Sequence, residues 1–234
     1  MSTLPDPHTL TFDVLIPADA QEVVTRTDDD GVKQASVFSL GGQRLASVVW
    51  GEDGVLGSFT TARWRIELHD NGMPRYAAPL VDGKIHGQTV QWTPQGEPLS
   101  VCTFKHGTGV DYWCDHETGA LAEEHPQVDG RPHGIERWWS EDENGPSVFH
   151  ERHWYHGMVH GIERWWVDES EAPDAGYPKF FIQNETVDRE SYLRAARDDS
   201  TLPPWRAADD RPHRALPTGF ARLIVRPRAW DGED

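Results

Sequence analysis

The chain has 234 residues, of which 37% are hydrophobic, and its 39 Asp and Glu outnumber its 22 Lys and Arg to give a net charge of −17. A hydrophobic share this low argues against a large spherical core, and the negative charge argues against binding to nucleic acid or to an anionic membrane. The sequence has no run of about 20 apolar residues that could span a membrane, and its two Cys do not make a disulfide framework.

Residues 1–39 are expected to form an N-terminal β cap. The first residues, MSTLPDPHTLTFDVLIP, lack the basic and long apolar regions of a signal peptide, so we expect a cytoplasmic, reduced protein. TLTFDVLIP and QEVVTR both have the composition of strands. A terminal repeat must hide an apolar edge, and this cap would do so.

Residues 40–167 contain an internal repeat. HGIERWW occurs at 133–139 and again at 160–166, and VDGKIHGQTVQW shares its frame of Gly-x-x-His-Gly followed by an aromatic residue. The His-Gly pairs begin at His86, His106, His133 and His160, with spacings of 20, 27 and 27 residues. A recurring period of this kind indicates a structural unit that the chain stacks.

Each copy is expected to form a β-hairpin of two short strands. The segments after His-Gly are short and rich in Trp, Ile, Val and Thr, and Gly-containing turns separate them. Alternation puts Arg137 and Trp139 on one side of a strand and Glu136 and Trp138 on the other. The hairpins would stack into one elongated antiparallel sheet, with Trp139 and Trp166 in one ladder and Trp138 and Trp165 in another.

The repeated positions are expected to be structural. Gly supplies the backbone conformations that tight reversals need, and the repeated His would make a turn hydrogen bond. This set comprises Gly83, His86, Gly87, His106, Gly107, Gly130, His133, Gly134, Trp139, Gly157, His160, Gly161 and Trp166.

Residues 168–234 are expected to form a C-terminal cap. KFFIQNETV is typical of a strand, and VDRESYLRAARDD of a short helix with Asp188 as its N-cap. Tyr192, Leu193 and Ala196 would form the apolar stripe of that helix.

The last 35 residues are rich in Pro and Arg. Residues 200–217 are expected to be an extended, Pro-rich tail that straps across the sheet. The basic cluster of Arg222, Arg226 and Arg228 could pair as an edge strand or bind a partner, and Pro227 argues against a central strand.

The pattern of Gly-x-x-His-Gly in units of 20-odd residues, with aromatic residues at the strand ends, resembles the MORN repeat. DGKIHG and DGRPHG are similar to its bacterial variant, and the resemblance covers about residues 40–167. It implies a mostly β fold of stacked hairpins and the function of an antitoxin in a toxin–antitoxin pair. The chain departs from the pattern at Thr108 and Gly109 and in the long insert between Gly107 and His133.

The Glu-Arg-Trp triplets are candidates for partner binding, because exposed Trp and Arg dominate binding hot spots. The alternative is that their charges pair across strands, worth about 0.2–1 kcal/mol each. The expected partner is a basic toxin domain, nuclease- or deaminase-like, which the carboxylates would steer and the protein would occlude. The candidate residues are Glu136, Arg137, Trp138, Glu163, Arg164 and Trp165.

Two other functions stay open. Other MORN-like proteins serve as scaffolds or lipid-associated modules. A zinc-dependent enzyme would need a metal site, for which Cys102, His106, Cys114 and His116 offer a Cys₂His₂ set with unfamiliar spacing. Because the sequence has no nucleophile elbow, P-loop or His-Glu-x-x-His motif, we expect no enzyme, no catalytic residue and no cofactor.

Overall fold

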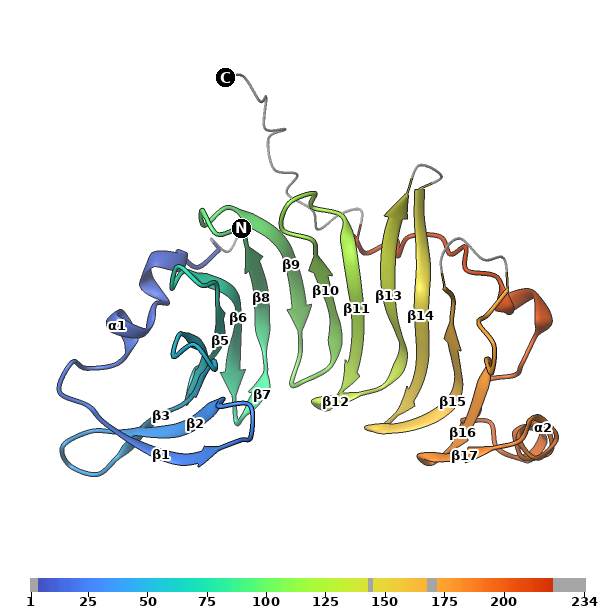
Figure 1. Ribbon diagram of the computed structural model, residues 1–234, viewed down its shortest axis with the longest axis horizontal. Helices are drawn as coiled ribbons and strands as arrows, with labels where there is room; N and C mark the ends of the chain where they lie inside the picture. The colour runs from blue at the N-terminus through green and yellow to red at the C-terminus, as the bar shows by residue number, and fades with distance from the viewer. Residues whose placement is uncertain (1–3, 143–144, 168–171, 221–234) are drawn as a thin grey trace, which may run out of the picture. The chain divides into compact units, whose positions relative to one another are not determined.

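The computed structural model describes residues 4–142, 145–167 and 172–220 (Figure 1). In these residues the chain is mostly β, with two antiparallel sheets and two α-helices, which confirms the predicted fold class at this level. Neither helix of the described part is long and apolar enough to cross a membrane. The predicted basic cluster of Arg222, Arg226 and Arg228 lies outside the described residues.

The described residues divide into two compact units. The first contains the residues up to 106 together with 116–119, and the second contains 107–115 and 120–220. The boundary near residue 106 falls inside the segment that the sequence assigns to the repeats. Each unit holds one of the two sheets, apart from the turn at 116–119.

The first sheet is a meander with strand order β1-β2-β3-β4-β5-β6-β8-β9, and β7 pairs with β6 at its side. A 3₁₀ helix at Pro7–Thr9 and the short helix α1 at Phe12–Leu15 precede it. The strands are β1 (Gln21–Thr27), β2 (Lys33–Phe38), β3 (Arg44–Trp50), β4 (Leu56–Thr61), β5 (Trp64–Leu68), β6 (Pro74–Val81), β7 (Lys84–Ile85), β8 (Gly87–Trp92) and β9 (Pro98–Phe104).

The core of the first unit is an apolar row that crosses the strands in register. Leu10 and Ile16, from the N-terminal segment, are buried in the same cluster. Burying such side chains is worth about 1.5–3 kcal/mol each, so this face is the main source of stability in the unit. The row consists of Ala35, Val48, Phe59, Ile66, Ala77 and Val90.

The N-terminal segment differs in part from its prediction. QEVVTR is a strand, as predicted, but TLTFDVLIP is not: it forms the end of the 3₁₀ helix and α1. Pro7 opens the 3₁₀ helix, where its missing N–H costs nothing, and the Asp6 side chain accepts a hydrogen bond from the backbone N–H of His8 at 3.0 Å. Packing on the sheet then outweighs the strand propensity of this apolar stretch.

The second sheet has strand order β10-β11-β13-β14-β15-β16-β17, and β12 pairs with β11 at its side. KFFIQNETV, predicted as one strand, is instead a hairpin, because Gln183 and Asn184 both adopt positive φ and reverse the chain. The strands are β10 (Gly109–Cys114), β11 (Leu121–Val128), β12 (Arg131–Pro132), β13 (Gly134–Asp142), β14 (Gly145–Tyr155), β15 (Met158–Trp165), β16 (Lys179–Ile182) and β17 (Glu185–Val187).

The predicted C-terminal helix is confirmed as α2, Arg189–Asp198, with Asp188 as its N-cap. The Asp188 carboxylate accepts hydrogen bonds from the backbone N–H of Ser191 at 2.8 Å and from its hydroxyl at 2.9 Å. Tyr192 is buried against Phe180 and Ile162, so the predicted apolar stripe anchors the helix on the second sheet. A second 3₁₀ helix follows at Ala207–Asp210.

Asp188→Ala is expected to lower the melting temperature of the second unit by about 2–4 °C, because it removes the acceptor that the first turn of α2 needs. Circular dichroism at 222 nm, followed on heating, measures this change. Asp198→Ala is the control. It removes an exposed carboxylate from the last turn of the same helix, where the dipole disfavours negative charge, so no loss is expected. An equal loss in both variants would contradict the assignment of the cap.

Candidate functional site

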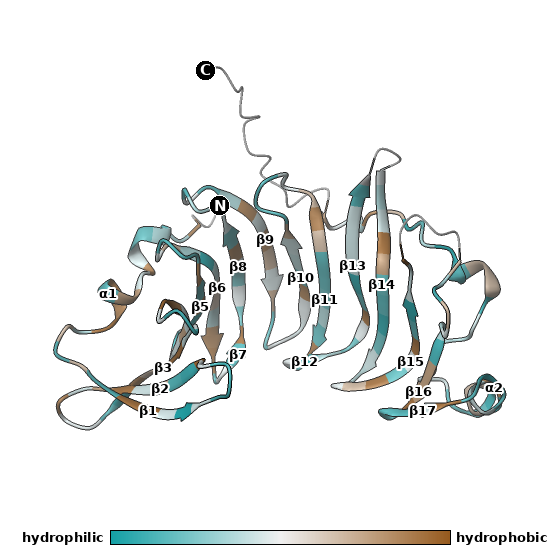
Figure 2. Ribbon diagram, in the orientation of Figure 1, coloured by the Kyte–Doolittle hydropathy of each residue, from teal (hydrophilic) through white to brown (hydrophobic). Residues whose placement is uncertain are grey.

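A row of alternating charge crosses strands β11, β13, β14 and β15. Glu124 pairs in register with Arg137, Arg137 with Glu151, and Glu151 with Arg164, and we call these four residues the Glu-Arg ladder. Arg137 donates to Glu124 at 2.9 Å and to Glu151 at 3.0 Å. Arg164 donates to the other oxygen of Glu151 at 3.0 Å. Figure 2 shows the hydrophilic character of these strands.

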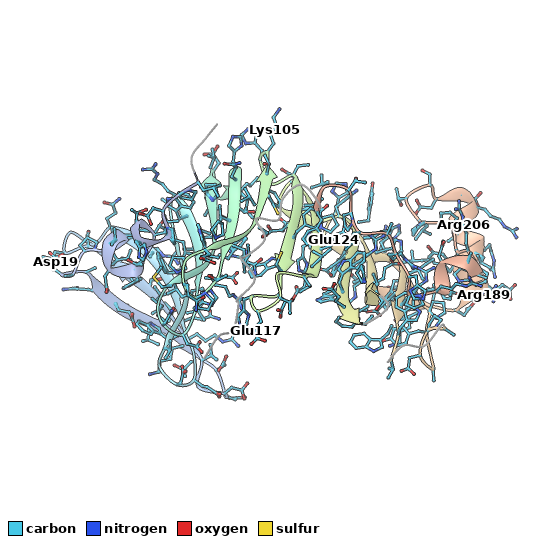
Figure 3. The ribbon with its side chains drawn as sticks, turned by 90° about the horizontal axis from the view of Figure 1, so that it is seen from above. Asp19, Lys105, Glu117, Glu124, Arg189 and Arg206 are labelled. Carbon is cyan, nitrogen blue, oxygen red and sulfur yellow. The ribbon has the colours of Figure 1, made fainter. Side chains whose placement is uncertain are left out.

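The segment after α2 contacts the end of the Glu-Arg ladder formed by Glu151 and Arg164. Figure 3 labels Glu124, at the other end of the ladder, and Arg206 of this segment. Asp210 accepts from Arg164 Nε at 2.8 Å, and Arg214 Nε donates to Glu151 at 3.3 Å. The side chains of Glu151 and Arg164 are consequently only 3% and 2% exposed. The charges at this end are therefore shielded from solvent and satisfied within the protein.

The electrostatics of the ladder favour the ionised forms of Glu151 and Arg137. Burial alone would raise the pKa of Glu151, but the guanidinium groups of Arg214 and Arg137 outweigh it and hold that pKa below its usual value. Burial would likewise lower the pKa of Arg137, yet the carboxylates of Glu151 and Glu124 raise it. Each charge thus depends on its neighbours in the row.

Three members of the predicted partner-binding set are engaged within the sheet. Arg137 and Arg164 belong to the Glu-Arg ladder, and Arg164 cannot reach a partner from its buried position. Glu163 is also buried, 5% exposed, and bonds to His150 and Arg152. Arg137 and Arg164 lie on the ladder face because successive residues of a strand point to opposite faces of the sheet. Glu163 shares the face of Trp165, where His150 and Arg152 bind it.

The other three predicted residues, Glu136, Trp138 and Trp165, lie on the face opposite the Glu-Arg ladder. Trp138 stacks on His150 at 4.5 Å between ring centroids, and His150 packs on Trp165 at 4.6 Å. The predicted ladder of Trp138 and Trp165 thus runs through His150, which the sequence analysis did not place there. All three residues of the prediction are partly exposed, and we call this surface the aromatic face.

A histidine between two carboxylates borders the aromatic face. His125 Nδ1 lies 2.6 Å from Glu136 and its Nε2 lies 2.6 Å from Glu123, so a protonated ring donates to both. Trp154 Nε1 donates to the second oxygen of Glu136 at 2.7 Å. Burial alone would lower the pKa of His125, but the hydrogen bonds to Glu123 and Glu136 outweigh burial and raise this pKa to about 9.

The repeated histidines make hydrogen bonds to turns. The Nδ1 atoms of His86, His133 and His160 each accept a backbone N–H from a turn, at 3.2, 3.3 and 3.1 Å. The donors are the first residues of the next tight turns, His106, His156 and Gln183. The glycine after each His has positive φ, as at Gly161, where an added Cβ would lie 2.6 Å from the Cβ of His153.

The prediction that His106-Gly107 is a His-Gly copy is wrong in phase. His106 and Gly107 have φ of 48° and 77°, which matches Asp82-Gly83 at 51° and 74°, the turn before a His-Gly pair. Val110 and Asp111 therefore follow at the His-Gly position. In a two-residue turn with both φ positive, the residue before Gly can be His as well as Asp. A search for His-Gly in the sequence therefore cannot tell the turn at His106-Gly107 from the repeat position that follows a turn.

The four residues of the predicted zinc set do not form a site. In the described part of the chain, no group of three or more His, Cys, Asp or Glu side chains is arranged to hold a metal ion. Cys102 and Cys114 are buried and form no disulfide, and His106 is the first residue of a tight turn. The zinc-enzyme alternative therefore has no geometry to support it here.

Carboxylates gather at one edge of the first sheet. A meander places alternate turns at the same edge, and the turns at 28–32, 51–55, 69–73 and 93–97 together carry seven Asp or Glu and no Lys or Arg. The turns at the opposite edge carry only Asp82 among carboxylates, together with the cations Arg63 and Lys84. The negative charge of this unit is thus concentrated at one edge.

Comparisons with known proteins give no family for the chain. No protein-family model matches it, and no curated protein is similar to it at a significant level. The likeness to MORN repeats is therefore a resemblance of short motifs, and the function has to be inferred from the residues themselves.

Proposed function

We propose that this chain is an antitoxin- or immunity-type protein that binds a basic toxin domain and occludes its active site. The observation that supports this most is the acidic edge of the first sheet. Its seven carboxylates form no ion pair with Lys or Arg in the part of the chain that the structure describes, and most of them are exposed. A surface of one sign raises the local concentration of a partner of the opposite sign.

A basic toxin domain fits both the negative charge of the acidic edge and the resemblance of the repeats to the bacterial MORN variant. Toxins that act on nucleic acid, such as nucleases and nucleobase deaminases, need a basic cleft for their substrate, and an acidic edge is complementary to it. Rim charges of this type act chiefly on the association rate. Short-range anchors are then needed to slow dissociation, and large partly exposed aromatic side chains supply them.

We assign the anchoring role to the aromatic face of the second sheet. Trp138 and Trp165 are held by the ring of His150, and Glu136 is fixed by Trp154 and His125. Because these side chains are already ordered, binding costs less side-chain entropy than for free rotamers. Arg137 and Arg164, which the sequence favoured as anchors, have no part in this interface.

The finer description of the fold belongs to the same proposal. We interpret the hairpins as MORN-like repeats, because the turn, the His that accepts its next N–H and the Gly after it recur at His86, His133 and His160. A cytoplasmic location would suit an antitoxin that meets its toxin where the toxin acts.

The association rate with the toxin is expected to fall about tenfold or more when the ionic strength rises from low to high values, since salt screens exposed charges beyond a Debye length of about 10 Å at 0.1 M. The partner to use is a small basic domain encoded beside this chain, identified by co-purification, and stopped-flow Trp fluorescence gives the rate. The variant Asp29→Asn/Asp30→Asn/Glu52→Gln should show a slower rate and a shallower salt dependence.

A matched triple variant, Asp19→Asn/Glu185→Gln/Asp198→Asn, removes the same charge from exposed positions outside the acidic turns. It should associate nearly as fast as the wild type. Equal slowing in both variants would mean that net charge alone matters, and a rate independent of salt would overturn the steering role. Binding to anionic vesicles in a sedimentation assay, without toxin binding, would favour the lipid-associated alternative.

A further inference from the structure

A pocket lies between the Glu-Arg ladder and the segment that covers it, inside the second unit. Its volume is about 340 Å³, at the lower end of pockets that take small molecules. Ladder residues Arg137, Glu151 and Arg164 form its floor, and the segment after α2 contributes Pro203 and Arg206 to its walls. The pocket therefore combines a charged floor with a cover from another part of the unit.

The floor of this pocket has hydrogen-bond donors to spare. Arg137 uses Nε and Nη1 for the ladder, whereas Arg164 uses Nη1 for Glu151 of the ladder and Nε for Asp210 of the cover segment. Within the described residues neither arginine has a partner for Nη2. Arg206 likewise makes no ion pair with any described residue, although it lines the same pocket. The Arg164 side chain is 2% exposed and lines the pocket, so its remaining donor is available there to water or to a ligand.

The charge of the lining is positive in a protein of net charge −17. Arg137, Arg164, Arg206 and Arg214 line the pocket against the two carboxylates of Glu151 and Asp209. Both oxygens of Glu151 already accept from arginines, so it does not compete for the free donors. The surplus of guanidinium groups suits a ligand with two negative charges.

His153 supplies the complementary acceptor. Its Nδ1 lies 2.6 Å from the carbonyl oxygen of Ile162 and donates to it, which leaves Nε2 as an acceptor at the pocket. Burial lowers the pKa of His153, so the ring is neutral near pH 7. A neutral imidazole nitrogen of this kind accepts from a hydroxyl group.

We propose that this pocket binds a small phosphomonoester that carries a hydroxyl group, with the phosphate on Arg137, Arg164 and Arg206 and the hydroxyl on His153. Planar guanidinium groups bind phosphate oxygens through charge-assisted hydrogen bonds, which are about twice as strong as neutral ones. The site is separate from the acidic edge and from the aromatic face, and the inference does not depend on the toxin proposal. A bound ligand would hold the cover segment against the sheet.

The test is isothermal titration calorimetry of the full chain with glycerol 3-phosphate and with inorganic phosphate, against chloride at matched ionic strength. Binding of glycerol 3-phosphate in the millimolar range or tighter is expected, with phosphate weaker because it has no carbon-borne hydroxyl for His153. Hydrogen exchange of residues 203–214 should slow when glycerol 3-phosphate is present. No heat beyond the chloride control for either probe would overturn the proposal.

Two variants with opposite expected effects sharpen the test. Arg206→Gln should weaken glycerol 3-phosphate binding about tenfold, since it removes a charged donor that makes no ion pair in the described fold. Asp209→Asn should tighten it, because it removes the one lining carboxylate that accepts no side-chain hydrogen bond in the described residues. Arg26→Gln, an exposed charge in the first unit, should change nothing. Unchanged affinity in Arg206→Gln, or weaker binding in Asp209→Asn, would exclude this site.

Discussion

Replacing Glu151 with alanine is expected to lower the free energy of unfolding of the second unit by about 3–5 kcal/mol, the usual cost of breaking a buried ion pair from one side. The Glu151 side chain is 3% exposed and accepts from Arg137, Arg164 and Arg214. Its loss leaves the buried Arg164 with Asp210 alone and Arg137 with Glu124 alone, and it removes the carboxylate that Arg214 pairs with. Urea denaturation followed by Trp fluorescence measures the change.

Glu67→Ala is the matched control in the first unit. Glu67 also lies between two arginines, Arg65 and Arg75, at 3.0 and 3.1 Å, but their side chains are 55% and 47% exposed. Solvent replaces the lost contacts there, so a loss below about 1 kcal/mol is expected. Equal losses in the two variants would show that the burial of the Glu-Arg ladder has no energetic consequence.

A double-mutant cycle separates the pair from its surroundings. Glu151→Ala and Arg164→Ala should couple by about 1–3 kcal/mol, because each single variant removes one charge of the buried pair and leaves the other, whereas the double variant removes both. A coupling near zero would contradict the direct pairing at 3.0 Å. Circular dichroism of both single variants at low urea establishes that they are folded.

The two sheets use the same repeat position in different ways. Val90, three residues after Gly87, lies in the apolar row of the first sheet, whereas Arg137 and Arg164, three residues after Gly134 and Gly161, form the ladder of the second. A one-residue slip between β13 and β14 would put Arg137 and Glu151 on opposite faces, so the ladder specifies the register. A buried ion pair contributes little net stability, so we interpret the ladder chiefly as a device that specifies the pairing register of β13 and β14.

Several turns and the helix of the second half could be predicted from the sequence because their signals are local. Gly at fixed offsets and two-residue turns such as Asp129-Gly130 determine where the chain reverses, and the positive φ of both residues agrees with this. Asp188 and the apolar stripe of Tyr192 likewise predict α2 with its N-cap. Each of these features depends on residues within one turn or hairpin.

The sequence-based predictions fail where contacts between residues far apart in the chain determine the local structure or the burial of a side chain. TLTFDVLIP has strand composition, yet Leu10 and Ile16 pack on the first sheet from helical turns. Arg164 is of a residue type that is common in binding hot spots. Its burial depends on the segment of Asp210, which lies 46 residues later and accepts a hydrogen bond from Arg164. His125 was not predicted as a site residue, because its two carboxylates come together through strand register. A search for His facing acidic residues on adjacent strands would have found it.

The free energy of unfolding is expected to fall by about 3 kcal/mol as the pH rises from 6.5 to about 9, where His125 loses its proton. The unfolded chain has the ordinary pKa of 6.5, so between these two values the folded state holds a proton that the unfolded state has lost. The stabilisation is therefore fully present below pH 6.5 and is absent above about pH 9. Urea denaturation at a series of pH values measures it.

The His125→Gln variant isolates this contribution, because other groups that titrate in the same range are left in place. The difference in unfolding free energy between wild type and variant should decline across the window and then level off above about pH 9. NMR titration of the His125 ring protons gives the folded-state pKa directly, and a midpoint near 6.5 would contradict the clamp between Glu123 and Glu136. In Glu136→Gln, one of the two acceptors loses its charge, so the midpoint should move down while Trp154 keeps an acceptor in the amide oxygen.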